Sequence, residues 1–293
     1  MNRRLTGLLV VLTPFVAGAA DEPANPLFEQ MRTRGVAVTD AVKVPLPAPL
    51  MADGLDAASQ QEILKKVVGN RFTVREFAAK LGTAPHVYNI RKIPAADADT
   101  PRVFALDVSF IAHGSLDRVA DRDFLEGLHQ KQKDRKVHIL TDEEIQKRKL
   151  ATESDKRRQE RYSHGVFTVL DRVEVSAAPH TVLTRQADSL LAATEIDSRF
   201  AGDTDFPNQW RKITFDDEGR RQFGPTRPYA GAGGYLKITR LHEPAGGLFV
   251  ECHQVYNEPK GWFGGADPLT TKLPAIIQSE VRTFRQELNR VKK

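Results

Sequence analysis

Cysteine is nearly absent from this chain, since Cys252 is its single example among 293 residues. No intramolecular disulfide can form, so packing must supply the stability of the fold, even in a compartment that permits disulfides. Beyond residue 20 the chain also lacks an apolar run long enough for a transmembrane helix. We therefore expect a soluble mature protein without a transmembrane segment.

The first twenty residues have the pattern of a secretory signal peptide. Arg3 and Arg4 form a basic head, an apolar run of about a dozen residues follows, and residues 17–20 are small. This run is too short to cross a bilayer as a helix. We expect cleavage near residue 20, a mature chain that starts near Asp21, and a periplasmic or secreted location. No cysteine follows the run to carry a lipid anchor.

A surplus of one sign of charge is also missing. The net charge of +5 falls to +3 once Arg3 and Arg4 are removed with the signal peptide. Basic and acidic residues are interleaved through the rest of the chain, which is not the pattern of a nucleic-acid-binding surface. We therefore expect no nucleic-acid partner.

Motifs for common catalytic chemistries are absent as well. No Gly-x-Ser-x-Gly elbow and no zincin motif occur, and the glycine run 231–234 precedes a predicted strand, whereas a phosphate loop precedes a helix. Cys252 lies among apolar strand residues, as a buried and inert thiol does. We predict no catalytic residues, no metal and no cofactor. Two weaker possibilities stay open. His242, Glu251 and His253 could bind a transition metal, and Asp107 and Asp171 could act as paired carboxylates in general acid–base catalysis.

The pattern after the signal peptide predicts an extended leader and one α+β domain. Residues 21–54 contain five prolines and should be extended along the body, and residues 55–293 should form the domain. Asp56 and Gly69 have the positions of a helix N-cap and stop. The segment 71–81 fits a helix or the start of a strand. Alternation predicts strands at 86–93 and 102–112. In the second strand, the even-numbered residues from Phe104 to Ala112 should lie on one face and the odd-numbered residues from Val103 to Ile111 on the other.

The middle of the chain is the most charged region and the second half is rich in strands. Residues 129–161 predict a solvated charged helical insertion that begins at Thr141, with a basic interaction surface as the alternative. Strands are expected at 166–175, 181–185, 190–196 and 210–215. Residues 235–243 and 248–256 should form a hairpin that places Arg240 near Glu251.

The C-terminal segment predicts a long amphipathic helix. Pro274 should lie in its first turn, so we expect the helix to begin near Thr271 or Lys272. Its apolar stripe should face the sheet and its charged side should face solvent. The stripe comprises Leu273, Ile276, Ile277, Val281, Phe284, Leu288 and Val291, and the charged side comprises Glu280, Arg282, Arg285, Glu287 and Arg290.

This order of elements resembles the helix-grip fold of the START-like lipid-transfer superfamily. The resemblance covers roughly residues 56–291 and rests on the element order and on the stretch from Tyr235 through Trp262-Phe263 to Leu288. It implies a curved antiparallel sheet packed against the last helix, with an apolar cavity between them. The loop 257–265 places Trp262 and Phe263 beside glycines, so the two rings either plug the end of the core or form a gate or membrane-touching tip.

The resemblance implies an exported, non-catalytic binding protein for a small hydrophobic or amphipathic ligand such as a lipid. Its candidate ligand-binding residues are Trp262, Phe263, Arg240, Phe284 and Asp171. Fold alone does not name a ligand. Two alternatives therefore stay open, which are an exported structural or protein-interaction module and a hydrolase built on carboxylates and histidines.

Overall fold

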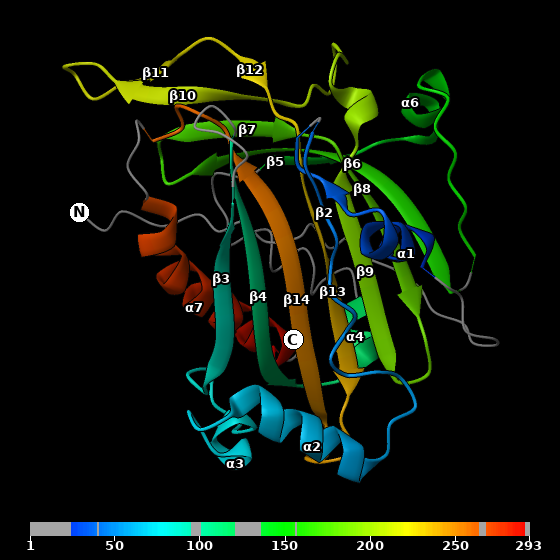
Figure 1. Cartoon of the computed structure of the whole chain (residues 1–293). Helices are drawn as coiled ribbons and strands as arrows, with labels where there is room; N and C mark the ends of the chain where they lie inside the picture. Colours follow the sequence, from blue (N-terminus) through cyan, green and yellow to red (C-terminus); the bar gives the residue numbers. More distant parts are fainter. Residues whose placement is uncertain are drawn as a thin grey trace.

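A computed structural model describes residues 25–39, 41–94, 101–120, 136–155, 157–263 and 268–290. The signal-peptide prediction and Val291 lie outside these residues. One antiparallel sheet dominates the described chain, with the long C-terminal helix α7 Pro268–Leu288 on one face and the helices α1 Pro26–Thr33 and α2 Ala57–Val68 on the other (Figure 1). The fold is α+β, as predicted, with the sheet packed against its C-terminal helix.

The sheet has twelve strands in the order β11-β10-β7-β6-β8-β9-β13-β14-β4-β3, with β12 beside β10 and β5 beside β6. Every pairing is antiparallel. The strands are β3 His86–Ile93, β4 Arg102–His113, β5 Lys136–Ile139, β6 Arg158–Val169, β7 Val173–Ala177, β8 Pro179–Arg185, β9 Ser189–Ile196, β10 Gln209–Phe215, β11 Arg221–Phe223, β12 Arg227–Pro228, β13 Ala232–Arg240 and β14 Gly247–Glu258. A separate two-stranded sheet pairs β1 Val36–Ala37 with β2 Lys43–Val44.

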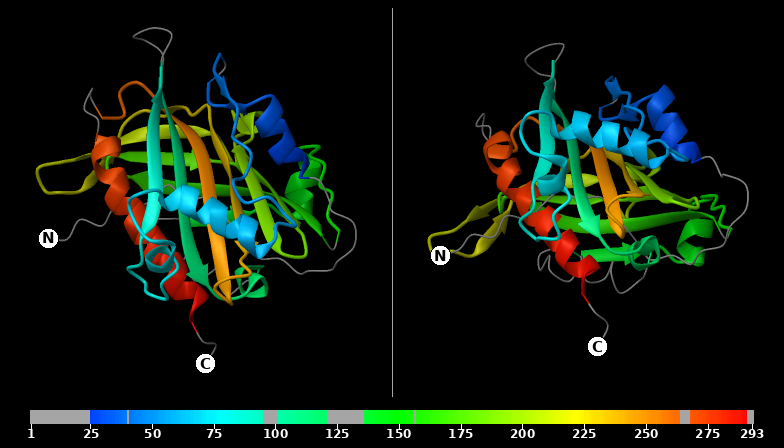
Figure 2. Two further views of the ribbon diagram at one scale, coloured as in Figure 1. Left: turned by 60° about the horizontal axis from the view of Figure 1, so that its bottom comes forward. Right: turned by 90° about the horizontal axis from the view of Figure 1, so that it is seen from below.

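The two faces of the sheet carry different apolar clusters. Even-numbered residues of β4, from Phe104 to Ala112, join the cluster that contains the buried stripe of α7 Pro268–Leu288. Val103, Ala105 and Ile111 face the other side, against the N-terminal segment and its helices. The alternation predicted from the sequence is confirmed. Seen from below, α7 and the pair α1 and α2 lie on opposite sides of the central strands (Figure 2).

The N-terminal segment is partly helical. Helix α1 Pro26–Thr33 starts at the N-cap Asn25, whose side chain accepts a hydrogen bond from the Phe28 amide. Proline is tolerated there because the first helical N–H has no partner within the helix. The leader predicted to be extended thus contains helix α1, and its residues 45–49 belong to neither helix nor strand.

Two predicted helix starts are confirmed by their caps. Helix α2 Ala57–Val68 has Asp56 as N-cap and Gly69 as C-cap. The ambiguous segment 71–81 forms the short helix α3 Val74–Phe77, with a capping box between Thr73 and Glu76. Further along, α4 spans Leu116–Ala120, and the rest of the helix predicted up to residue 128 lies outside the described residues.

Of the charged helical insertion predicted at 129–161, residues 129–135 and 156 lie outside the described residues, and most of the described part is not helical. Thr141 does begin a capped helix, α6, but it spans only Asp142–Lys147. Within 129–161, β5 pairs with β6, and β6 begins at Arg158. A short 3-10 helix, η1, spans Ser198–Phe200. Arg148, the C-cap of α6, forms an ion pair at 2.6 Å with Asp203 in the loop after η1. The high charge of this region predicted correctly that α6 has no buried residue, but it did not predict how short the helix is.

The single strand predicted at 166–175 is a hairpin. Leu170 and Asp171 have φ values of 53° and 54°, so the chain reverses between β6 and β7. The predicted hairpin at 235–256 is confirmed as β13 and β14. Most of the glycine run 231–234 is part of the hairpin, because β13 already includes Gly233 and Gly234. A Cβ at Gly234 would lie 2.2 Å from the His253 carbonyl oxygen, so this close approach needs glycine.

Candidate ligand-binding site

Helix α7 presents an apolar stripe to the sheet. Leu273, Ile277, Val281 and Phe284 are all buried, and their spacing of three to four residues places them on one side of the helix. Pro274 lies inside the helix, in the second turn after its start at Pro268, so the prediction that it occupies the first turn is wrong. The helix begins earlier than the proline position suggested.

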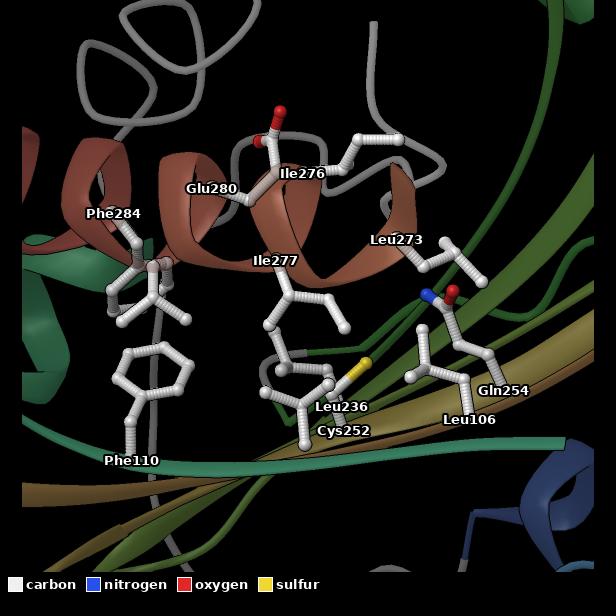
Figure 3. Close-up of a pocket in the computed structure, with 12 residues that line it drawn as sticks. Leu106, Phe110, Leu236, Cys252, Gln254, Leu273, Ile276, Ile277, Glu280 and Phe284 are labelled. Atoms are coloured by element: carbon white, nitrogen blue, oxygen red, sulfur yellow. The ribbon is translucent and has the colours of Figure 1, made fainter. Parts of the chain in front are cut away.

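A small cavity lies between α7 and the sheet, with a volume of about 40 Å³. Figure 3 shows Ile277 and Phe284 pointing from the helix toward the strands and Glu280 pointing away from them. The residues around it come from β4, β13, β14 and α7, and they are Leu106, Val108, Phe110, Leu236, Cys252, Gln254, Leu273, Ile276, Ile277, Glu280, Val281 and Phe284.

The lining is chemically suited to hydrocarbon. Ten of the twelve side chains carry no oxygen or nitrogen, and the exceptions are Gln254 and Glu280. The Cys252 thiol is buried, and burial raises its pKa to about 12, which leaves it protonated and unreactive at neutral pH. The site can therefore exclude water and hold apolar groups, and it offers no nucleophile.

The C-terminal half of α7 is fixed to the sheet by a buried arginine. Arg285 donates hydrogen bonds to the carbonyl oxygens of Ile111, Ala84 and Pro85 at 2.8, 2.6 and 3.0 Å. Its guanidinium carbon also lies 5.4 Å from the centre of the Phe110 ring. Burial lowers its pKa to about 10, so it stays charged at neutral pH. The prediction that Arg285 and Glu287 face solvent is wrong, since both are buried.

Only one of the five predicted ligand-binding residues borders the cavity. Phe284 lines it and packs edge-on against Phe110, with ring centroids 5.4 Å apart. Trp262 and Phe263 are buried in the same apolar cluster without lining the cavity. Trp262 stacks on Tyr229 at 5.7 Å. The two rings therefore lie as a plug at the end of the core in this conformation.

Arg240 and Asp171 lie elsewhere on the surface of the fold. Arg240 forms an ion pair with Asp188 at 3.1 Å, and its register partner on β14 is Leu248. The predicted pairing of Arg240 with Glu251 is wrong, because β14 starts at Gly247 and Lys237 takes the position opposite Glu251. Asp171, in the β6–β7 turn, lies 3.5 Å from Arg221.

The alternative catalytic sets do not assemble as one site. His253 contacts Asp107 at 2.8 Å, but Asp171 pairs with Arg221 and His242 contacts the Leu55 carbonyl oxygen. Among the described residues, no group of three or more His, Cys, Asp or Glu side chains is arranged to hold a metal ion. Sequence reasoning named none of the other eleven lining residues as ligand-binding, and the two polar ones among them are Glu280 and Gln254. Gln254 lies on β14. Its place on the helix-facing side follows from the alternation of β14.

Within the described part of the chain, no helix combines the length and the apolar character that crossing a bilayer requires.

No protein-family model and no curated protein matches this sequence. Among solved structures, the chain is similar to the human StarD13 (DLC2) lipid transfer and protein localization domain, with 9% identity and a TM-score of 0.37 over 70% of this chain and 85% of that one. It is also similar to human STARD10, with 8% identity and a TM-score of 0.35 over 80% of this chain and 84% of that one. Both are START domains, the family that the element order resembles. At these TM-scores the likeness assigns neither ancestry nor ligand.

Proposed function

We propose that this protein is an exported, non-catalytic carrier or sensor of a small apolar or amphipathic molecule such as a lipid, bound between α7 and the sheet. The observation that carries the proposal is the cavity itself, whose lining is almost wholly apolar and joins an amphipathic helix to three strands. An apolar lining favours hydrocarbon, because a polar ligand buried there would lose its hydrogen bonds to water.

The closed cavity is too small for a lipid chain. A volume of about 40 Å³ holds a few water molecules at most, whereas pockets for drug-sized ligands measure roughly 300–1,000 Å³. Binding therefore requires α7 to move. Arg285 ties the C-terminal half of the helix to Ile111, Ala84 and Pro85, so the half from Pro268 to Ile277 is the part proposed to lift.

The small volume also favours the second candidate, an exported protein-interaction module with a solid core. The two candidates differ in one measurement. Lipids extracted from the purified full chain would be identified by mass spectrometry, and a pyrene-labelled fatty acid would be titrated into the lipid-free protein. Saturable binding supports the carrier, and no binding across a broad lipid panel supports the interaction module.

A cavity-filling variant gives this test a matched control. Ile277→Phe adds volume where the side chain enters the cavity and should lower the affinity for the fatty acid at least about tenfold. Ile238→Phe adds the same volume to the same core at a position that does not line the cavity. Equal affinities for the two variants would place the ligand elsewhere.

Export is the other part of the proposal. The basic head, apolar run and small residues of 1–20 support it. Expression with the native N-terminus followed by N-terminal sequencing of the exported protein should give a chain that starts near Asp21. Exported protein that begins at Met1 would contradict cleavage.

A further inference from the structure

Residues 45–54, called the strap here, cross the face of the sheet opposite α7. Leu46 is buried with α1 and the β1–β2 pair, and Met51 is buried with α2, α3 and Phe249. Prolines at 45, 47 and 49 keep the first part extended. In Figure 2 this segment runs between α1 and α2 across the strands. The strap thus lies over β13 and β14, to which its polar contacts are made.

Beneath the strap lies a buried carboxylate. Glu251 on β14 is completely buried and accepts hydrogen bonds from the backbone amides of Leu50 and Met51 at 2.7 and 3.2 Å. Two residues further on, Asp53 forms an ion pair with the buried Lys237 of β13 at 2.9 Å. The strap is therefore held by polar contacts that exist only when it is closed.

An imidazole links this carboxylate to the next strand. His253 Nδ1 lies 2.8 Å from Asp107 Oδ1 on β4, and His253 Nε2 lies 3.8 Å from Glu251 Oε2. Its ring stacks on Tyr235, with centroids 4.8 Å apart. His253 Nε2 has no hydrogen-bond partner among the described residues, and its polar neighbour is the Glu251 carboxylate at 3.8 Å.

The charges around the cluster balance only when His253 carries a proton. The carboxylates are Asp53, Asp107 and Glu251, and the other cations are Lys237 and Arg91, which lies 3.5 Å from Asp107. Asn89 and the Tyr235 hydroxyl also face the cluster. Asn89 carries an uncharged amide, and Tyr235 is neutral because burial raises its pKa well above the ordinary value. A neutral His253 would leave one buried negative charge without a counter-charge, which is costly.

We propose that His253 is a proton-operated latch for the strap: the strap closes over the protonated imidazole and opens when that proton is lost. The device acts through Glu251, which is buried beneath Leu50 and Met51 and lies 3.8 Å from His253 Nε2. It is independent of the cavity under α7, which lies on the other face of the sheet.

The direction of the pH effect follows from the proton balance. Burial alone would lower the pKa of His253, but its contacts with Asp107 and Glu251 outweigh burial and raise the pKa above 6.5. A base with a raised pKa in the closed state stabilises that state fully below its ordinary pKa and loses this effect as the pH rises through the raised value. The strap should therefore be closed at pH 6 and should open on the alkaline side.

Hydrogen exchange of the full chain tests the latch. Between pH 6 and pH 9, the protection of the Leu50 and Met51 amides, corrected for intrinsic exchange, should fall about tenfold for each unit by which closure raises the pKa of His253. The amide of Val250, inside β14, should keep its protection and so distinguish strap opening from global unfolding. A flat profile at Leu50 and Met51 would overturn the proposal.

Two variants complete the test. His253→Gln cannot be charged and should give weak protection of the strap at both pH values, whereas His180→Gln, which changes another histidine paired with a glutamate, should keep the wild-type profile. An unchanged pH dependence in His253→Gln would refute the latch.

If His253→Gln does not fold, the pKa of His253 can be measured by NMR in the wild type and in Met51→Ala, which weakens the strap. That pKa should move down toward 6.5 in Met51→Ala, and equal values in the two proteins would refute the coupling.

Discussion

The Arg285 guanidinium on α7 donates its Nε–H to the Ile111 carbonyl oxygen on β4 at 2.8 Å. This bond joins the last helix directly to a central strand, and two more bonds from the same side chain reach Ala84 and Pro85. Three backbone carbonyls thus depend on one cation. The helix is held to the sheet by a polar contact at one end and by apolar packing along the rest.

Arg285→Ala should lower the free energy of unfolding by about 3 kcal/mol or more, because it leaves buried carbonyl oxygens without donors. Urea denaturation measures the change. Arg282→Ala, at an exposed position one turn earlier, should change stability by less than about 0.5 kcal/mol. Equal destabilisation by the two substitutions would show that the three hydrogen bonds contribute little.

The sequence predicted the faces of the strands better than the polar contacts of the helix. Alternation in β4 is a direct consequence of strand geometry, so Phe104 and Val103 could be assigned to opposite faces. Arg285 was placed in solvent because a charged residue normally lies there. Its burial depends on the carbonyl groups of Ala84, Pro85 and Ile111, which lie 174 to 201 residues earlier in the chain, and no local pattern reports them.

The same distinction explains the errors in the middle of the chain. Thr141 and Glu144 predicted a helix start correctly, because capping is a local interaction. The reversal at Leu170 and Asp171 was missed, because leucine rarely adopts a positive φ and because Asp171, a residue type that does adopt it more often, lies within an alternating apolar run. The cavity could be expected from the amphipathic α7, but its volume depends on how the side chains interlock, which the sequence does not report.

Acid should weaken the contact between the C-cap of α6, Arg148, and Asp203 in the loop after η1. The hydrogen bond from Arg148 lowers the pKa of Asp203 to about 2. A lowered carboxyl pKa stabilises the folded state above the ordinary value of 3.8 and loses this effect as the pH falls toward 2.

Asp203→Asn should therefore reduce the loss of stability between pH 5 and pH 2.5 relative to the wild type. Urea denaturation at the two pH values measures this difference. Asp217→Asn, at an exposed turn position, should keep the wild-type pH dependence. If Asp203→Asn lost as much stability between pH 5 and pH 2.5 as the wild type, Asp203 would not contribute to the acid sensitivity.

The reactivity of Cys252 should show whether its thiol is buried beside the cavity. Burial raises its thiol pKa from 9.0 to about 12, so the thiolate fraction at pH 8 is roughly a thousandfold lower than in the unfolded chain. Reaction with an aromatic disulfide reagent should be slower in the native protein by at least this factor. Full reactivity in urea is the control, and rapid reaction of the folded protein would contradict burial of this thiol.

Gly234 should tolerate no side chain. A Cβ at this position would lie 2.2 Å from the His253 carbonyl oxygen and 2.8 Å from the Gln254 Cα, and both are backbone atoms in a central strand. Gly234→Ala should therefore force β13 and β14 apart and lower the free energy of unfolding by about 2 kcal/mol or more. Gly202→Ala, where a Cβ meets nothing within 4 Å, should leave stability nearly unchanged. Because Gly234 lies one residue from Tyr235, the same substitution should also weaken protection of Leu50 and Met51 if the strap depends on the spacing of these strands. Equal melting temperatures for the two alanine variants would show that the strands can separate at Gly234 without cost.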